Sequence, residues 1–159
     1  MSIDTSSSAG SSRRAVLKAG AHAAWAVPAV QVATMVPAMA ASGTPTLAVA
    51  VARTISGTTM AATVTVSASA GAGTISNVQL TLSGAGLSST SALSENSANW
   101  SAFTTRTTTY NGSLTPGTSL TTFTVTITNI DKGGSNGQPI LFAVSGAGAN
   151  AGSTSVQTK

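Results

Sequence analysis

The sequence predicts an all-β domain built as a sandwich of two sheets, and three observations support this. Short runs in which apolar residues alternate with Thr, Ser, Ala or Gln recur through most of the chain after residue 44. Turn-forming groups rich in Gly, Pro and Asn separate these runs. No stretch in this part combines a helical period with capping residues. Strands with one apolar face bury it most readily against a second sheet.

The first three strands follow from parity and from the turns between them. Leu47, Val49 and Val51 fall on one face of the first run, and similar alternation follows in the next two. Ser56-Gly57 and Gly71-Ala72-Gly73 mark the turns. The expected strands are residues 45–53, 58–69 and 74–83.

The second half of the chain predicts five further strands. Phe123, Val125 and Ile127 alternate with threonines in the clearest of them. Asn111-Gly112 and Pro116-Gly117 supply turns before it. The expected strands are residues 98–104, 107–114, 119–130 and 139–145, with a last short strand near 153–158.

Length, cysteine content and charge limit the possibilities. Residues 41–159 exceed the roughly 70–80 residues below which one core needs staples, and the chain has no cysteine, so packing alone holds the fold. Part of the net charge of +4 comes from the first forty residues. The charged residues after them are Arg53, Glu95, Arg106, Asp131, Lys132 and Lys159. They form no basic stripe along which a phosphate backbone would bind, so no nucleic-acid partner is expected.

The first forty residues carry the pattern of an export signal. The run Ser12-Arg13-Arg14-Ala15-Val16-Leu17-Lys18 is followed by an Ala-rich apolar segment, and small residues stand at Ala38 and Ala40. The run resembles the twin-arginine export motif, with Val16 where that family usually has Phe. The resemblance implies a helical signal peptide over residues 1–40, partnered by the twin-arginine (Tat) translocase and then by signal peptidase, which cuts after Ala40. Such substrates fold before they cross the membrane.

The alternatives for this leader are an uncleaved anchor and a fortuitous basic helix. Polar and proline interruptions at His22, Pro28, Gln31 and Pro37 make it a poor permanent span, so none is expected. The predicted organisation is signal peptide 1–40, linker 41–44 and β-sandwich domain 45–159.

Three segments carry a second resemblance: Thr63–Val66, Gly73–Leu82 and Gly112–Ile127, the last with a Leu-x-Pro-Gly turn. They resemble the Ig-like conserved-repeat and cell-adhesion-related (CARDB-like) modules of bacterial surface proteins. The resemblance implies an immunoglobulin-like β-sandwich of about seven to eight antiparallel strands. Related modules often carry a cysteine pair around the region from Trp100 to Tyr110, which here has none, and commonly occur in tandem with a wall anchor, whereas this sequence holds one copy.

The chemistry of residues 41–159 argues against catalysis. This part has no His or Cys, and its two carboxylates, Glu95 and Asp131, fall in different predicted loops. We therefore expect no enzyme, no catalytic residue and no cofactor. Asn129, Asp131 and Asn136 offer oxygens to a calcium ion, but a loop of turn formers explains them better, so no metal is expected.

Aromatic residues are the remaining candidates for ligand contact. Trp100 and Tyr110 are the two candidate contacts, as a stacking platform for a sugar. The competing interpretation places Trp100 in the core with Phe123 and Phe142, because this domain has few large side chains. Burial of Trp100 favours that interpretation; exposure of both rings on one face favours a sugar.

The function that these observations favour is a secreted or cell-surface, non-catalytic module with an adhesive, structural or protein-binding role. Its sheet edges, short of charged residues, would accept a partner strand. The alternative is a carbohydrate-binding module that uses exposed aromatics, and a third option is a hydrolase accessory or inhibitor domain. The expected partner is a cell-wall component, a surface protein or a polysaccharide, and the expected location is extracellular or cell-wall associated.

Overall fold

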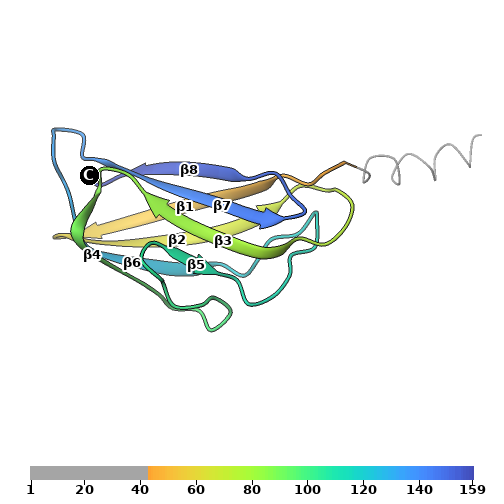
Figure 1. Ribbon diagram of the computed structural model, residues 1–159. Coiled ribbons are helices and arrows are strands. Elements are labelled where there is room, and N and C mark those ends of the chain that lie inside the picture. The colour runs from red at the N-terminus through yellow and green to blue at the C-terminus, as the bar shows by residue number, and fades with distance from the viewer. Residues whose placement is uncertain (1–42) are drawn as a thin grey trace, which may run out of the picture. The chain divides into compact units, whose positions relative to one another are not determined.

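Eight antiparallel strands form two four-stranded sheets in the computed structural model, which describes residues 43–159 (Figure 1). Sheet I has the order β1-β2-β6-β4, and sheet II has the order β5-β3-β7-β8. The strands are β1 Leu47–Ser56, β2 Thr59–Ala68, β3 Ser76–Ser83, β4 Leu87–Glu95, β5 Thr107–Thr109, β6 Phe123–Ile130, β7 Pro139–Ala147 and β8 Gly152–Gln157. No helix occurs in this part of the chain. The predicted all-β sandwich is confirmed.

The strand order is that of an immunoglobulin-type sandwich with one addition. A constant-type domain has its first, second, fifth and fourth strands in one sheet and its third, sixth and seventh in the other. Strands β1, β2, β6 and β4 match the first set, and β3, β7 and β8 match the second. The addition is the three-residue β5, which comes after β4 in the chain and extends sheet II beside β3.

The core lies between the sheets and is built from the alternating apolar positions. Val64, Val66, Val125 and Ile127 are fully buried, and each is followed by a threonine or serine on the opposite side of its strand. Phe142 is the largest fully buried side chain. Other members are Leu47, Met60, Ile75, Val78, Leu80, Leu82, Leu114 and Ile140. Period-two alternation therefore determines which side of each strand is buried.

Polar groups inside this core are all bonded. The hydroxyl of Thr108 donates to the carbonyl oxygen of Ser101 at 2.5 Å. The hydroxyl of Thr158 donates to the carbonyl oxygen of Asp131 and accepts a hydrogen bond from the Gln138 amide. No buried side-chain nitrogen or oxygen of residues 43–159 lacks a partner. The buried polar side chains therefore replace their hydrogen bonds to water with bonds inside the protein, and none destabilises the interior by lacking a partner.

The sequence-based boundaries are wrong in one region. Residues 87–95 form β4, which was not expected, whereas the expected strand 98–104 is a loop and the expected strand 107–114 shortens to β5. Strand β4 is rich in serine, and a bulge between Leu87 and Ala92 interrupts its pairing with β6. A bulge shifts the parity of the residues beyond it, so alternation gives a weak signal there. The expected strand 119–130 begins in regular form only at Phe123.

The first residues of the domain join β1 to the turn before β8. The Leu47 amide donates to the carbonyl oxygen of Asn150, and the Asn150 amide donates to that of Pro45, both at 2.8 Å. Gly152 begins β8 beside this contact. A Cβ added there would collide with the backbone carbonyl of Leu47. Close approach of two backbones therefore requires glycine at this position.

Replacing Gly152 by alanine is expected to lower the free energy of unfolding by about 1–3 kcal/mol, because the two backbones must separate to admit the methyl group. Gly43→Ala is the matched control, since a Cβ there meets nothing within 4 Å. The control is expected to change stability by less than about 0.5 kcal/mol. Urea unfolding followed by circular dichroism measures both. Equal stability of the two variants would show that the β1–β8 contact adjusts freely.

Candidate functional site

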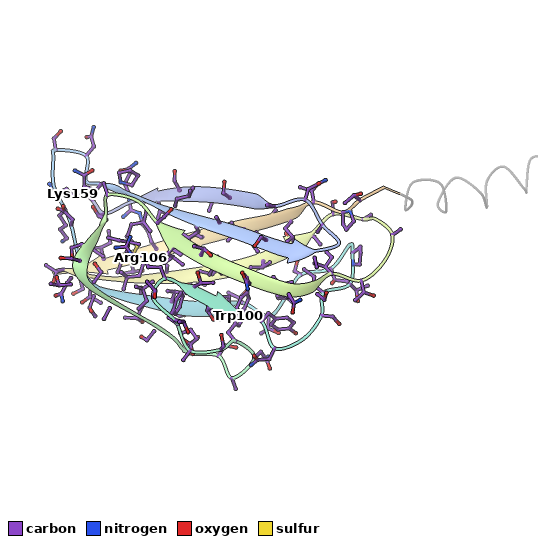
Figure 2. The ribbon with its side chains drawn as sticks, in the orientation of Figure 1. Trp100, Arg106 and Lys159 are labelled. Atoms are coloured by element: carbon purple, nitrogen blue, oxygen red, sulfur yellow. The ribbon has the colours of Figure 1, made fainter. Side chains whose placement is uncertain are left out.

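Trp100 lies in the core. Only 4% of its surface is exposed. Its ring stacks on Phe123 with centroids 4.6 Å apart and planes inclined by 26°, and it meets Tyr110 at 5.6 Å in a tilted arrangement. Figure 2 shows Trp100 well away from Lys159, which lies at the end of the sandwich where β8 finishes. A ring enclosed in this way offers no open face for a sugar to stack on, so the placement favours the core interpretation.

Tyr110 occupies the margin of the same cluster. Its residue is half-buried, and the ring packs against the core beside Trp100. Its backbone amide donates to the carbonyl oxygen of Val78. Phe103 packs at the margin in the same manner. The structure therefore does not bring two exposed aromatic faces together on one surface.

The two carboxylates are far apart. Glu95 ends β4 opposite Val125, whereas Asp131 follows the last residue of β6. Val125 and Asp131 are six residues apart along an extended strand, which corresponds to about 20 Å. Among residues 43–159, no group of three or more His, Cys, Asp or Glu side chains lies close enough to hold a metal ion.

Two of the three residues considered for calcium, Asn129 and Asp131, have other partners. The Asp131 carboxylate accepts a hydrogen bond from the Gly133 amide at 2.8 Å, as a turn-forming aspartate does. The Asn129 side-chain amide donates to the carbonyl oxygen of Thr90. Asn136 is exposed in the loop before β7. These contacts build a turn and the β4 bulge.

The most distinctive surface is the outer face of sheet I, here called the threonine face. Ladder partners share a side of the sheet, so the register identifies its members. They are Ala48, Ala50, Ala52, Thr54 and Ser56 of β1, Thr59, Ala61, Thr63, Thr65 and Ser67 of β2, Thr124, Thr126 and Thr128 of β6, and Ala92 and Ser94 of β4. The Thr65 hydroxyl bonds that of Thr122, just before β6, at 2.8 Å. Four strands therefore present methyl and hydroxyl groups with no charged side chain.

The outer face of sheet II is also free of charge. It carries Gln79, Thr81 and Ser83 of β3, Leu141, Ala143 and Ser145 of β7, and Ser153, Ser155 and Gln157 of β8. Leu141, at 37% exposure, is the one large apolar side chain exposed on the described part of the chain. A single exposed leucine is ordinary for a protein surface and defines no patch.

All six charged residues of the described domain lie at sheet edges or at one end. Arg53 is on β1 and Glu95 on β4, the two edge strands of sheet I. Arg106 precedes β5 and donates to the carbonyl oxygen of Ser88 on β4. The other three, Asp131, Lys132 and Lys159, belong to the loop after β6 and to the residue beyond Thr158. The expectation that the edges are short of charged residues is wrong, because Arg53 and Glu95 lie on edge strands and Arg106 directly precedes a third edge strand, β5.

Sequence reasoning did not identify the threonine face, although its signal was present. Threonines stand at every second position from 122 to 128, and Thr59, Thr63 and Thr65 share one parity in the earlier strand. Such spacing is typical of strands with one hydroxyl-bearing side. Which strands lie side by side depends on the ladder β2–β6, which joins residues about sixty positions apart. Only the structure shows that the two threonine columns are neighbours.

The export motif Ser12, Arg13, Arg14, Leu17 and Lys18 and the cleavage residues Ala38 and Ala40 lie outside the described residues. Within residues 43–159 the structure has no helix with the length and hydropathy of a membrane span.

No model of a known protein family matches the chain, and no curated protein matches its sequence.

Proposed function

We propose that the chain is an exported, non-catalytic immunoglobulin-like module with an adhesive, structural or protein-binding role, and that the threonine face is its contact surface. The observation that carries this proposal is the distribution of side chains. Hydroxyl and methyl groups cover four neighbouring strands, and every charged residue of the described domain stands elsewhere. The partner is a cell-wall component, a surface protein or a polysaccharide of the bacterium that exports the chain.

The chemistry of threonine supports contact through this face. Each hydroxyl donates one hydrogen bond and accepts others, and each methyl group contributes apolar area. No charge has to be desolvated when such a surface is covered, which removes the largest cost of burying a polar face. The β-branched side chains also have few rotamers to lose on a sheet. A partner therefore binds with little ordering cost on the side of the module.

Rigidity supports the role of a passive module. The core is closed, the buried polar side chains are satisfied, and residues 43–159 hold together without disulfides. Such a domain suits the twin-arginine route proposed from the leader, in which the protein folds before export and gains no cross-links afterwards. The chain enters the domain at one end, and β8 finishes at the other (Figure 1). Within residues 43–159, the first residue and the last therefore lie at the ends of the sandwich and not on its broad faces.

The double variant Thr63→Lys/Thr126→Lys tests the contact surface. Both residues lie on the threonine face, on the central strands β2 and β6. Burying an unpaired ammonium against a partner costs several kcal/mol, so retention of the exported protein on the cell envelope is expected to fall at least about tenfold. The amounts in envelope and medium fractions, with and without chemical cross-linking of whole cells, measure this.

Gln79→Lys/Ser153→Lys is the matched control, because it adds the same charge to the outer face of sheet II. Its retention is expected to equal that of the natural protein. Equal retention of all three proteins would exclude the threonine face as the contact surface. Loss in the control alone would move the contact to sheet II.

A further inference from the structure

The ladder partners that lie side by side across the four strands of sheet I form rows, and one of these rows has a charged residue at each end. Arg53 pairs with Ala62, Ala62 with Val125, and Val125 with Glu95. Ala62 and Val125 are fully buried, so this row belongs to the side of the sheet that faces the core. Arg53 and Glu95 therefore start from core-facing positions on the two edge strands, β1 and β4, with opposite charges.

The backbone groups of the same residues point toward the open edges. Ser56 and Thr59 flank a two-residue turn, so they form a hydrogen-bonded pair, and every second residue from Ser56 back to Ala48 bonds β2. The amide and carbonyl of Arg53 face away from β2. The Asn96 amide donates to the carbonyl oxygen of Thr124, so Asn96 is a residue whose backbone groups face β6. Because this direction alternates along a strand, the backbone groups of the preceding residue, Glu95, point outward.

We propose that Arg53 and Glu95 keep the two edges of sheet I from pairing with a second copy of this chain. A strand added to β1 or β4 would bond the outward backbone groups of these residues and cover their side chains between core-facing neighbours. Inward-pointing charges are a known protection of edge strands, and each charge is covered without a partner in every register except the one that sets Glu95 of one copy beside Arg53 of the next. This inference is independent of the threonine face, which lies on the opposite side of the sheet.

The second copy is the partner to be excluded because the geometry of sheet I permits continuation. Its three ladders are all antiparallel, so β1 and β4 run in opposite directions. The β4 edge of one copy beside the β1 edge of the next would extend the antiparallel sheet by simple repetition. A head-to-tail contact of this kind does not close and produces filaments.

Other features of the edges act in the same sense. The Arg53 guanidinium donates to the backbone carbonyl of Lys159, so its charge is held across the side of the sandwich where β1 and β8 lie. On the opposite side, the hydroxyls of Ser88 and Ser91 both donate to the carbonyl oxygen of Asn129 at 2.9 Å within the β4 bulge. Bulges distort an edge and hinder regular pairing. The bulge covers only the first half of β4, and Glu95 lies in the regular half.

Neutral variants test the proposal on the exported, processed protein. In Arg53→Thr/Glu95→Thr both edges lose their charge and gain a residue suited to strands. Its self-association constant is expected to rise at least about tenfold, with a molar mass in light scattering that grows with concentration. Arg53→Lys/Glu95→Asp keeps both charges and is expected to stay monomeric, like the natural protein, although the guanidinium contact to Lys159 is altered.

Single variants give a second, independent measurement. Arg53→Thr opens only β1 and Glu95→Thr opens only β4, so mixing the two is expected to produce a dimer that neither forms as strongly alone. Hydrogen exchange should then slow at the outward amides of Val51 and Leu93. Circular dichroism of each protein establishes that it is folded before its mass is interpreted.

Two results would overturn the proposal. The first is a folded double variant, or a mixture of folded single variants, that remains monomeric at every concentration. The second is association of the natural protein that Arg53→Thr/Glu95→Thr abolishes. That outcome would mean that Glu95 of one copy attracts Arg53 of the next, since the two residues share a row.

Discussion

Replacing Trp100 by alanine is expected to lower the free energy of unfolding by about 3–5 kcal/mol, the range for deleting a large buried aromatic side chain. The ring is almost fully enclosed and stacks on Phe123, which is itself buried. Its removal exposes Phe123 and Tyr110 to a cavity that the two sheets cannot close without moving. For a domain of ordinary stability, about 5–15 kcal/mol, this is a large fraction of the total.

Chemical denaturation followed by far-ultraviolet circular dichroism measures this effect, because Trp100 is the one tryptophan of residues 43–159 and cannot report on its own deletion. Trp100→Phe keeps a ring against Phe123 and is expected to lose less stability than Trp100→Ala. Tyr110→Ala removes a half-buried ring and is also expected to cost less. An unchanged midpoint for Trp100→Ala would mean that the Trp100 side chain spends its time outside the core. The carbohydrate-binding alternative would then have support.

The parts of the fold that were predictable are those where local sequence records burial. Val64 and Val66 on β2, and Val125 and Ile127 on β6, alternate strictly with polar residues and lie in central strands with one buried side. The Ser56-Gly57 turn was also predictable, here from backbone conformation. Gly57 has a φ of +58°, which glycine adopts without strain and which the first central residue of a type II′ turn requires.

Strand β4 was missed because its structure depends on a distant partner. Asn129 on β6 has a φ of +55° and a carbonyl oxygen that receives both serine hydroxyls of the bulge. The segment Leu87–Glu95 has no strong alternation of apolar and polar residues, and it forms a strand by pairing its backbone with β6. Trp100, in contrast, falls within the expected strand 98–104, although a loop brings it into the core. Large aromatic residues satisfy burial from any backbone conformation, so they indicate location better than secondary structure.

The candidate surface was predictable in composition and not in position. The sequence indicates a hydroxyl-rich exterior with few charges, yet the six charged residues of the domain look scattered along it. Arg53 and Glu95 are forty-two positions apart, and they occupy one row only after two further strands are paired between them. The pairing of strands that are distant in the sequence therefore places the charges at the edges and leaves the faces uncharged. A single sequence does not show which distant strands pair.

Replacing both Arg13 and Arg14 by lysine is expected to abolish export and leave the full chain, with its leader, in the cytoplasm. Lysine keeps the positive charge that orients a leader at the membrane but lacks the planar, five-donor guanidinium group. A general secretory signal would tolerate the exchange, whereas recognition of the arginine pair would not. Fractionation of cells and medium, with antibody detection of the domain, measures the result.

Arg106→Lys is the matched control for this experiment, since it makes the same exchange within the folded domain, where Arg106 contacts Ser88. It is expected to be exported normally, and N-terminal sequencing of the exported protein should begin at Ala41. Continued secretion of Arg13→Lys/Arg14→Lys would refute the twin-arginine assignment, and a different first residue would move the cleavage site. Because residues 43–159 form a closed core without a cross-link, a block at the leader should leave a folded domain inside the cell. Protease resistance of the retained chain would therefore separate a defect in recognition from a defect in folding.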